Sequence, residues 1–308
     1  MDKSPIISVV SPIYKAEFFV EKLVFEIQKV MSVIDVDYEI ILVDDRSPDN
    51  SWIRMKELSN SNPKVKSIRL SRNFGQHPAI MAGLSKAQGE WIVVMDCDLQ
   101  DQPKELEKLY NKTIEGFDIV LARRAQRKDS NLKKLSSKIF SKVYGFFTDT
   151  KYDNEIGNFG IYNKKVIESI LQVSDYIKFF PLFVNFVGYN STSIEVEHAS
   201  RESGSTSYSF SKLISLAFNS IISFSNKPLK IFVKFGIIIS LLSFLVGTYY
   251  LYEAFTNRIE VIGYTSIIVS IWFLSGVIIT TIGITGIYVG KIFDQTKNRP
   301  VFIIDEEV

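Results

Sequence analysis

Two long apolar segments lie near the C-terminal end of the sequence. Residues 231–252 carry a single charge, Lys234, and residues 261–289 carry none. A helix rises about 1.5 Å per residue, so each segment extends roughly 33 Å or more, enough to cross the hydrocarbon core of a bilayer. The connector 253–260 is too short for a domain. We therefore expect a transmembrane helix hairpin over residues 230–291; the alternative, a pair of buried core helices, is disfavoured by these lengths.

Basic residues flank the outer ends of both apolar segments. They are Lys227, Lys230 and Lys234 around the start of the first, and Lys291, Lys297 and Arg299 after the second. The only basic residue of the connector is Arg258. The positive-inside rule then predicts that both termini are cytoplasmic. No signal-peptide pattern precedes the first apolar run at residue 6, so we expect the soluble part to stay in the cytoplasm.

Outside the apolar end, the composition is that of an ordinary globular domain. Only three residues between Phe235 and Gly290 are charged, whereas the rest of the chain is about 27% charged. This composition excludes a disordered, collagen-like or coiled-coil chain, and the net charge of +2 gives no reason to expect nucleic acid as a partner. One cysteine, Cys97, and two histidines exclude a disulfide framework and a metal centre built from cysteine or histidine.

Residues 208–224, just before the first apolar segment, have apolar side chains at helical spacing. They predict either a helix in the membrane interface or a helix packed on the soluble domain. In the second apolar segment Gly283, Gly286 and Gly290 allow a close helix contact, within the hairpin or in a homo-oligomer. The predicted division is a soluble domain 1–206, a juxtamembrane amphipathic helix 207–229, the hairpin 230–291 and a cytoplasmic tail 292–308.

Apolar strand runs and helical patterns alternate through the first 120 residues. The strands are expected at residues 6–10, 38–43, 65–70, 91–95 and 117–121, with helices near 17–33, 50–59, 78–87 and 103–115. Such alternation is typical of an α/β fold with a doubly wound, mostly parallel sheet. Ligands of these sheets bind beyond the carboxyl ends of the strands.

Acidic pairs follow two of the predicted strands. Asp44 and Asp45 follow the second strand, and Asp96 and Asp98 follow the fourth. Alternation along an extended strand end places the Asp96 and Asp98 carboxylates on one side and turns Cys97 toward the interior. Hard oxygen ligands at this spacing suit Mg²⁺ or Mn²⁺ bound to a diphosphate. Because neither a Gly-x-Gly-x-x-Gly nor a Walker A pattern is present, we expect a nucleotide to bind through metal and carboxylates.

Two further aspartates precede predicted helices and are interpreted as helix caps. Asp49 stands before Asn50 and Ser51, and Asp101 stands before a proline at position 103.

The motifs along the chain resemble those of the family 2 glycosyltransferases with a GT-A fold. They are Pro12-Ile-Tyr14, Val43-Asp44-Asp45-x-Ser47, Ser71-Arg-Asn-Phe-Gly-Gln-His77, Asp96-Cys-Asp98-Leu-Gln100, Arg201-x-x-Gly204 and Gly286-Ile-Tyr288-Val-Gly290-Lys291. More narrowly, the chain resembles membrane-anchored polyprenyl-phosphate glycosyltransferases: dolichol-phosphate mannose synthases, bactoprenol glucosyltransferases and the undecaprenyl-phosphate aminoarabinose transferases. The resemblance covers nearly the whole chain.

This resemblance implies a role for individual residues. Donor-binding positions would be Pro12, Tyr14, Glu17, Asp44, Asp45, Asp96, Arg124 and Arg127; metal-binding positions would be Asp96, Asp98 and Gln100; catalytic positions would be Asp98, Arg201 and Asn158. Arg201 would also meet the lipid phosphate, for which a bidentate guanidinium is apt. A solvated basic stretch is the alternative explanation of Arg124 and Arg127.

Three positions depart from the family pattern. Asn158 replaces an aspartate proposed as a base in some members, Ser207 replaces a cationic residue, and Lys15 stands where many members carry asparagine. An acceptor phosphate with a pKa near 6 is already largely ionised at neutral pH, so attack needs positioning more than a general base. Asn158 would then bear on acceptor placement or sugar choice, and Lys212 or the juxtamembrane lysines would substitute for the missing cation.

The resemblance implies an inverting transfer of a sugar from a nucleotide sugar to undecaprenyl phosphate at the cytoplasmic face of a bacterial inner membrane. A UDP-sugar is the favoured donor, and the product would serve cell-envelope polysaccharide or lipid modification. One alternative is a non-catalytic membrane scaffold that binds nucleotide sugars. A processive polysaccharide synthase is disfavoured, because none of the three tryptophans lies in a Gln-x-x-Arg-Trp motif.

Overall fold

The computed structural model describes residues 5–124, 145–147, 156–175, 179–197, 221–222, 225–256 and 263–308. The chain forms two compact units. Unit 1 comprises Met1–Lys142, Thr150–Ser207 and Arg299–Val308, and unit 2 comprises Val143–Asp149 and Tyr208–Asn298. The last ten residues, predicted as a tail, therefore belong to unit 1.

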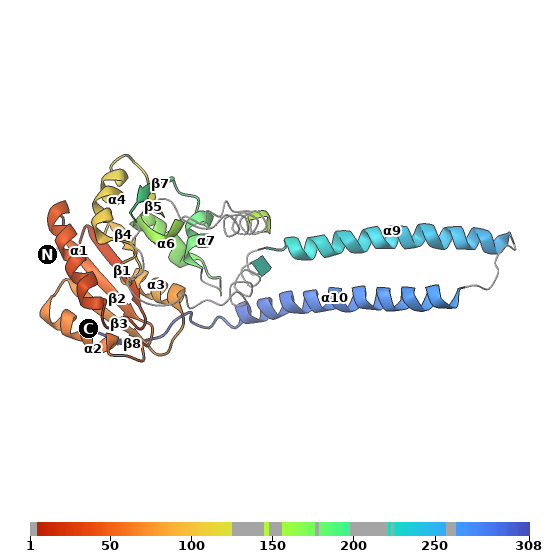
Figure 1. The fold of residues 1–308 in the computed structure, drawn as a ribbon, viewed down its shortest axis with the longest axis horizontal. Helices are drawn as coiled ribbons and strands as arrows, with labels where there is room; N and C mark the ends of the chain where they lie inside the picture. The colour runs from red at the N-terminus through yellow and green to blue at the C-terminus, as the bar shows by residue number, and fades with distance from the viewer. Residues whose placement is uncertain are drawn as a thin grey trace. The chain divides into compact units, whose positions relative to one another are not determined.

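Unit 1 is built on a sheet with the strand order β7-β5-β6-β4-β1-β2-β3-β8 in the described residues (Figure 1). The strands are β1 (Ile7–Ile13), β2 (Tyr38–Asp44), β3 (Val65–Leu70), β4 (Trp91–Val94), β5 (Ile119–Arg124), β6 (Ile156–Asn163), β7 (Ser191–Val196) and β8 (Ile304–Glu307). The central strands β3, β2, β1 and β4 are all parallel, which confirms the predicted doubly wound core. β6 and β8 run antiparallel to their neighbours, so the complete sheet is mixed.

Helices cover both faces of this sheet because alternate residues of the central strands are apolar on each side. One group comprises α1 (Val20–Ile34), α2 (Ser51–Ser61), the short 3₁₀ helix η1 (Pro103–Glu105) and α4 (Leu106–Thr113); the other comprises α3 (Gln76–Leu84), α6 (Lys164–Gln172) and α7 (Phe180–Phe186). Val9 of β1 belongs to the core cluster that contains Leu23 of α1. On the other face a Cβ at Gly83 of α3 would overlap Val10.

The predicted elements are present with boundaries shifted by a few residues, and both predicted helix caps are different. The helix expected over residues 103–115 is divided into η1 and α4, and its N-cap residue is Gln102, which makes no side-chain cap hydrogen bond. Asp101 is buried, and its carboxylate lies 3.9 Å from the Arg124 guanidinium. The cap prediction for Asp101 is therefore wrong, because the residue faces the carboxyl end of β5. The N-cap residue of α2 is Asn50, which makes no side-chain cap hydrogen bond, so Asp49 is not the N-cap either; its carboxylate accepts hydrogen bonds from the N–H and the hydroxyl of Ser51.

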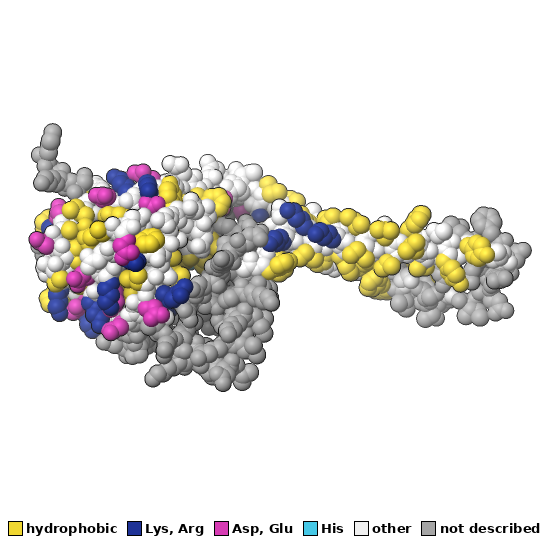
Figure 2. Space-filling model, turned by 90° about the horizontal axis from the view of Figure 1, so that it is seen from above, with side chains coloured by type: hydrophobic (Ala, Val, Ile, Leu, Met, Phe, Trp, Pro, Cys, Tyr) yellow, Lys and Arg dark blue, Asp and Glu magenta, His cyan; other side chains and the backbone are white. Residues whose placement is uncertain are grey.

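Unit 2 contains the two long apolar helices α9 (Lys227–Phe255) and α10 (Tyr264–Thr296), which lie side by side as an antiparallel pair (Figure 1). By length and composition both are able to cross a membrane. Their described surface is largely apolar, and basic side chains gather toward one end of the pair (Figure 2). The Tyr288 hydroxyl of α10 donates a 2.8 Å hydrogen bond to the Ser225 carbonyl, just before α9.

The glycines of α10 do not mediate the contact with α9. A Cβ added at Gly283, Gly286 or Gly290 would meet no atom of the described residues within 4 Å. Of the two explanations that the sequence leaves open, hairpin packing therefore does not account for them. The predicted amphipathic helix at 208–224 lies outside the described residues except for Ile221 and Ile222.

Candidate active site

The loops that follow β1, β2 and β4 meet at the carboxyl ends of the central strands. Each contains a non-glycine residue in the left-handed backbone region: Lys15 (φ 55°), Arg46 (φ 56°) and Leu99 (φ 58°). Such conformations cost on the order of 1 kcal/mol or more and gather at functional sites, where the surrounding structure holds them in place. The same edge of the sheet carries both predicted acidic pairs.

The loops after β1 and β2 are joined by hydrogen bonds between backbone and side chains. The Lys15 N–H donates to Ser47 Oγ (3.2 Å) and the Ala16 N–H to Ser51 Oγ (3.0 Å). The Asn50 N–H donates to a Glu17 carboxylate oxygen (3.0 Å). Three of the predicted donor-binding residues lie here: Pro12 is buried within β1, Glu17 joins the two loops, and Tyr14 has 44% of its surface exposed.

Asp44 and Asp45 organise these loops from the end of β2. Asp44 is buried; it accepts the Ser47 N–H (2.9 Å) and lies 3.4 Å from Arg69 Nε. Asp45 accepts the N–H groups of Phe74 and Gly75 at 2.7 and 2.9 Å, which ties the loop after β3 to β2. Burial raises the pKa of Asp45, and these two hydrogen bonds oppose the rise. Nucleoside contact by this pair stays a prediction.

The second acidic pair belongs to a larger cluster of carboxylates at the end of β4. Burial, with repulsion from Asp101 and Asp98, raises the pKa of Asp96 to about 6. Burial likewise raises the pKa of Asp101 to about 6, although the nearby Arg124 opposes the rise. Concentrated negative charge with raised pKa values is what a bound cation would relieve.

Two neutral side chains hold the Asp96 carboxylate. Gln76, the first residue of α3, donates from Nε2 to Asp96 Oδ1 at 2.7 Å. The side-chain amide of Asn158, on β6, also hydrogen-bonds Asp96 and lowers its pKa. The position where the family carries an aspartate therefore touches a predicted metal ligand, and an amide there adds no charge to the cluster.

The turn after Asp96 is formed by the rest of the Asp-x-Asp-Leu-Gln motif. Asp98 accepts the Gln100 N–H at 3.2 Å across the left-handed Leu99. Cys97 packs against the core cluster, as predicted, and burial raises the pKa of its thiol to about 12. Burial therefore favours the protonated thiol over the nucleophilic thiolate.

The oxygen donors of this turn fit a hard divalent cation. No group of three His, Cys, Asp or Glu side chains is preformed for a metal in the described part of the chain. Two carboxylates, Asp96 and Asp98, would therefore be supplemented by ligand or water oxygens, as is common for Mg²⁺.

Arg124 lies beside the acidic cluster with 23% of its side chain exposed, so it is not part of a freely solvated basic stretch. The predicted residues Arg127, Arg201 and Lys212 lie outside the described residues, and their roles stay predictions.

Sequence reasoning missed the contacts of Gln76, Phe74 and Gly75 with the two acidic pairs. Their position in the Ser71–His77 motif was the available signal.

The chain matches known proteins over most of its length. A family model described as glycosyl transferase family 2 matches residues 8–171. The chain is 35% identical to an uncharacterised glycosyltransferase of Synechocystis sp., with 97% of this chain and 95% of the relative covered. It is 32% identical to the bactoprenol glucosyl transferase of Shigella phage SfV, with 98% of each chain covered. It is also 32% identical to the undecaprenyl-phosphate 4-deoxy-4-formamido-L-arabinose transferase of Proteus mirabilis, with 98% and 94% covered.

Solved structures share the fold of unit 1. Mannosyl-3-phosphoglycerate synthase from Rubrobacter xylanophilus aligns with a TM-score of 0.52 at 13% identity, over 71% of this chain and 73% of the other. Glucosyl-3-phosphoglycerate synthase from Mycobacterium tuberculosis, solved with Mn²⁺, UDP-glucose and phosphoglyceric acid, aligns with a TM-score of 0.51 at 14% identity, over 71% and 78%. The sheet order and the acidic strand ends agree with the family model and the relatives. The chain therefore belongs to glycosyltransferase family 2 and is a glycosyltransferase with a GT-A-like fold.

Proposed function

We propose that this protein transfers a sugar, with inversion, from a nucleotide sugar to a polyprenyl phosphate, undecaprenyl phosphate in bacteria. The observation that carries the proposal is that one chain joins a carboxylate cluster at the ends of the central strands to two helices of membrane-spanning length. Relatives at 32% identity that are named for bactoprenol and undecaprenyl phosphate support the acceptor.

The reaction joins an oxygen of the acceptor phosphate to the anomeric carbon of the donor sugar. The bond from that carbon to the diphosphate breaks, and the nucleoside diphosphate leaves with the electron pair. Because the acceptor oxygen is already ionised, no proton has to be removed. An amide at Asn158 is compatible with this step, since the protein has to position two anionic groups rather than supply a base.

Asp96 and Asp98 would hold Mg²⁺ or Mn²⁺, with Gln100 beside them. When bound, this cation would neutralise the charge that develops on the leaving diphosphate. Gln76 and Asn158 orient Asp96 through their amides. Arg124, which already faces the cluster, is suited to a phosphate of the donor.

The hairpin would keep the active site close to the membrane plane that holds the acceptor head group. The lysines at the start of α9 (Lys227, Lys230 and Lys234) and the basic residues in and after the last turns of α10 (Lys291, Lys297 and Arg299) favour the cytoplasmic side for both ends. This orientation supplies the water-soluble donor from the cytoplasm and the lipid from the inner membrane. Arg201 and Lys212 are the proposed cationic contacts of the lipid phosphate.

The test is a transfer assay with the purified full-length chain in undecaprenyl phosphate bilayers. A panel of UDP- and GDP-sugars is supplied with Mg²⁺ or Mn²⁺, and the lipid products are identified by mass spectrometry. We expect one donor class, UDP-sugars, to give a monoglycosyl phospholipid, and chelation of the metal to abolish it. Donor binding without any glycolipid would reject the transfer and leave a nucleotide-sugar-binding scaffold.

A further inference from the structure

The C-terminal strand β8 belongs to unit 1, runs antiparallel to β3 and begins beside the loop that follows β2. Ser67 and Val308 exchange two backbone hydrogen bonds, at 2.8 and 2.9 Å. Arg69 of β3 lies opposite Glu306, and the next residue, Leu70, lies opposite Ile304, so Asp305 has no direct counterpart. An extra residue of this kind is a β-bulge, which redirects a side chain out of the regular ladder.

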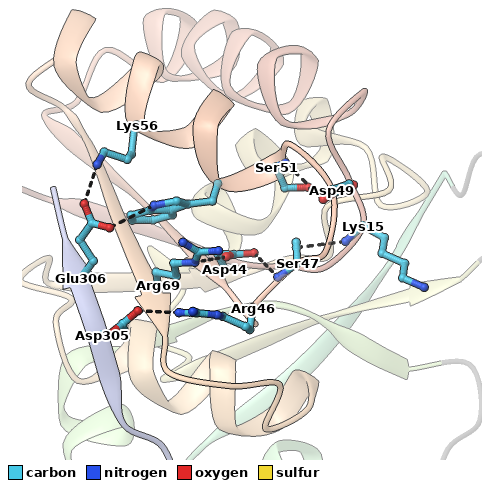
Figure 3. Close-up of polar contacts among 11 residues, drawn as sticks. Lys15, Asp44, Arg46, Ser47, Asp49, Ser51, Lys56, Arg69, Asp305 and Glu306 are labelled. Carbon is cyan, nitrogen blue, oxygen red and sulfur yellow. Dashed lines mark hydrogen bonds and ion pairs between the residues drawn. The ribbon is translucent and has the colours of Figure 1, made fainter.

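Asp305 contacts the loop that contains Asp44 and Asp45. Its carboxylate accepts a hydrogen bond of 2.5 Å from Arg46 Nη1, and the two side chains point toward each other (Figure 3). Arg46 adopts a left-handed backbone conformation directly after Asp45. One residue further along, the Ser47 N–H donates a hydrogen bond to the Asp44 carboxylate. The ion pair therefore stabilises the middle of a short loop, where Arg46 has a left-handed backbone conformation that non-glycine residues rarely adopt.

Glu306 reaches the same loop by a second route. One carboxylate oxygen accepts from Lys56 of α2 at 2.5 Å, and the other accepts from the Trp52 indole N–H at 3.2 Å (Figure 3). The Arg69 guanidinium lies 5.6 Å from the centre of the Trp52 ring, and Arg69 Nε lies 3.4 Å from the buried Asp44 carboxylate. Asp305 thus contacts the loop directly at Arg46, and Glu306 is linked to its first residue, Asp44, through Trp52 and Arg69.

Glu307, the third acidic residue of β8, offers an internal comparison. It pairs with Lys86, which follows α3, at 2.5 Å. The side-chain exposures of this pair, 40% and 46%, match the 41% and 48% of the Arg46–Asp305 pair. The two ion pairs differ in that only Asp305 contacts the loop after β2.

We propose that β8 is a positioning element for the donor nucleotide. Asp305, through Arg46, and Glu306, through Trp52 and Arg69, hold the 44–47 loop in the conformation that receives the nucleoside. This inference rests on the proposed function, because it takes the loop after β2 as part of the donor site. The acidic side chains of β8 contact the loop after β2, helix α2 and the segment after α3, and not the Asp96–Asp98 turn, so we expect their removal to change donor affinity and leave the transfer step alone.

The experiment compares Asp305→Arg with Glu307→Arg in the full-length protein. Binding of UDP and of GDP, each with Mn²⁺, is measured by calorimetry; donor KM, acceptor KM and kcat follow from the transfer assay. For Asp305→Arg we expect the nucleotide Kd and the donor KM to rise about two- to fivefold, the range for loss of a half-exposed ion pair. The acceptor KM and kcat stay unchanged, and Glu307→Arg binds nucleotide as the wild type does.

The charge swap Asp305→Arg with Arg46→Asp separates positioning from damage to the strand. Aspartate is tolerated in the left-handed region, so the swap adds no backbone strain at position 46. We expect it to restore nucleotide affinity. Equal losses in Asp305→Arg and Glu307→Arg, or no recovery in the swap, would overturn the proposal. A wild type that binds nucleotide but forms no glycolipid rejects the proposed transfer and still allows the binding comparison that tests β8. A wild type that binds no nucleotide rejects both proposals.

Discussion

At the scale of single residues, the site is organised by neutral groups around a cluster of carboxylates. The positions of Asp44, Asp45, Asp96 and Asp98 were predictable because each follows an apolar strand. The partners that hold them were not, because hydrogen bonds such as Gln76 to Asp96 join loops that are distant in sequence. An apolar pattern locates a strand end but carries no information on which loop lies beside it.

Replacement of Asn158 tests whether a neutral amide beside Asp96 stabilises the carboxylate cluster. Asn158→Asp removes the amide that donates to Asp96 and adds a carboxylate to a cluster in which the pKa values of Asp96 and Asp101 are already raised to about 6. Without metal at pH 7.5 we expect the free energy of unfolding to fall by about 1–3 kcal/mol, with Mn²⁺ recovering most of it. Thermal unfolding in chelator and in Mn²⁺ measures both quantities.

Asn163→Asp is the matched control, because Asn163 ends the same strand and caps α6 by accepting the Lys165 N–H, which an aspartate does equally well. Unchanged metal-free stability in Asn158→Asp would mean that the amide does not hold Asp96.

His77 predicts a specific acid sensitivity. Burial lowers its pKa from 6.5 to about 4, and its Nδ1 is buried with no hydrogen-bond partner among the described residues. Between pH 4 and pH 6.5 the folded protein therefore binds fewer protons than the unfolded chain. The contribution of neutral His77 to the free energy of unfolding is complete above pH 6.5 and is lost as the pH falls toward 4. Between pH 7 and pH 5 the loss from this group is about 2 kcal/mol.

His77→Phe preserves an aromatic contact with Phe179, whose ring lies 4.6 Å away, and removes the titration. Denaturant unfolding at pH 7 and pH 5 should show a smaller acid loss in the variant. An identical loss in both proteins would show that His77 is not buried as a neutral group.

At the scale of elements, patterns with a strong apolar period were predictable and edge strands were not. β1, β2 and β4 are buried on both faces and are mostly apolar, whereas β3 has buried apolar positions and the half-buried Lys66 and Arg69. β7 and β8 are edge strands with mostly polar residues, so nothing in their hydropathy separates them from loops. β8 pairs with β3 through backbone hydrogen bonds, and its three acidic side chains meet basic partners on three different segments.

We expect opposite effects on stability when two helical glycines are replaced by alanine. A Cβ at Gly83 of α3 would overlap Val10 and lie 3.0 Å from Val43 Cγ2, so Gly83→Ala should destabilise unit 1 by about 1–3 kcal/mol. A Cβ at Gly286 of α10 would meet nothing within 4 Å in the described residues, and Gly286→Ala should leave stability and transfer unchanged. Thermal unfolding in detergent and the transfer rate measure the two effects. Damage from Gly286→Ala would instead reveal another chain packed on that face.

At the scale of the whole molecule, the two apolar helices interrupt a domain that closes only after them. Their lengths made the hairpin predictable, whereas the return of Arg299–Val308 to unit 1 was not. A chain that stops at residue 207 therefore loses the hairpin and β8 together.

Replacing residues 208–298 with a flexible Gly/Ser linker removes the hairpin and preserves β8. We expect this variant to bind nucleotide nearly as the full chain does, but to transfer sugar to bilayer undecaprenyl phosphate about a hundredfold more slowly, because the local acceptor concentration is lost. Calorimetry and the bilayer assay measure the two properties. Equal transfer rates with and without the hairpin would show that the helices do not serve acceptor access.

The most direct measurement is the initial rate of glycolipid formation from labelled nucleotide sugar and undecaprenyl phosphate, in wild type and in Asp98→Asn, across a range of Mn²⁺ concentrations. Asp98 lies in the turn after β4, and its carboxylate accepts the Gln100 N–H. The wild-type rate should rise with Mn²⁺ to saturation, and Asp98→Asn should lose about a hundredfold or more of it at every concentration. A full rate in Asp98→Asn, or no glycolipid from the wild type with any donor, would contradict transfer at this site.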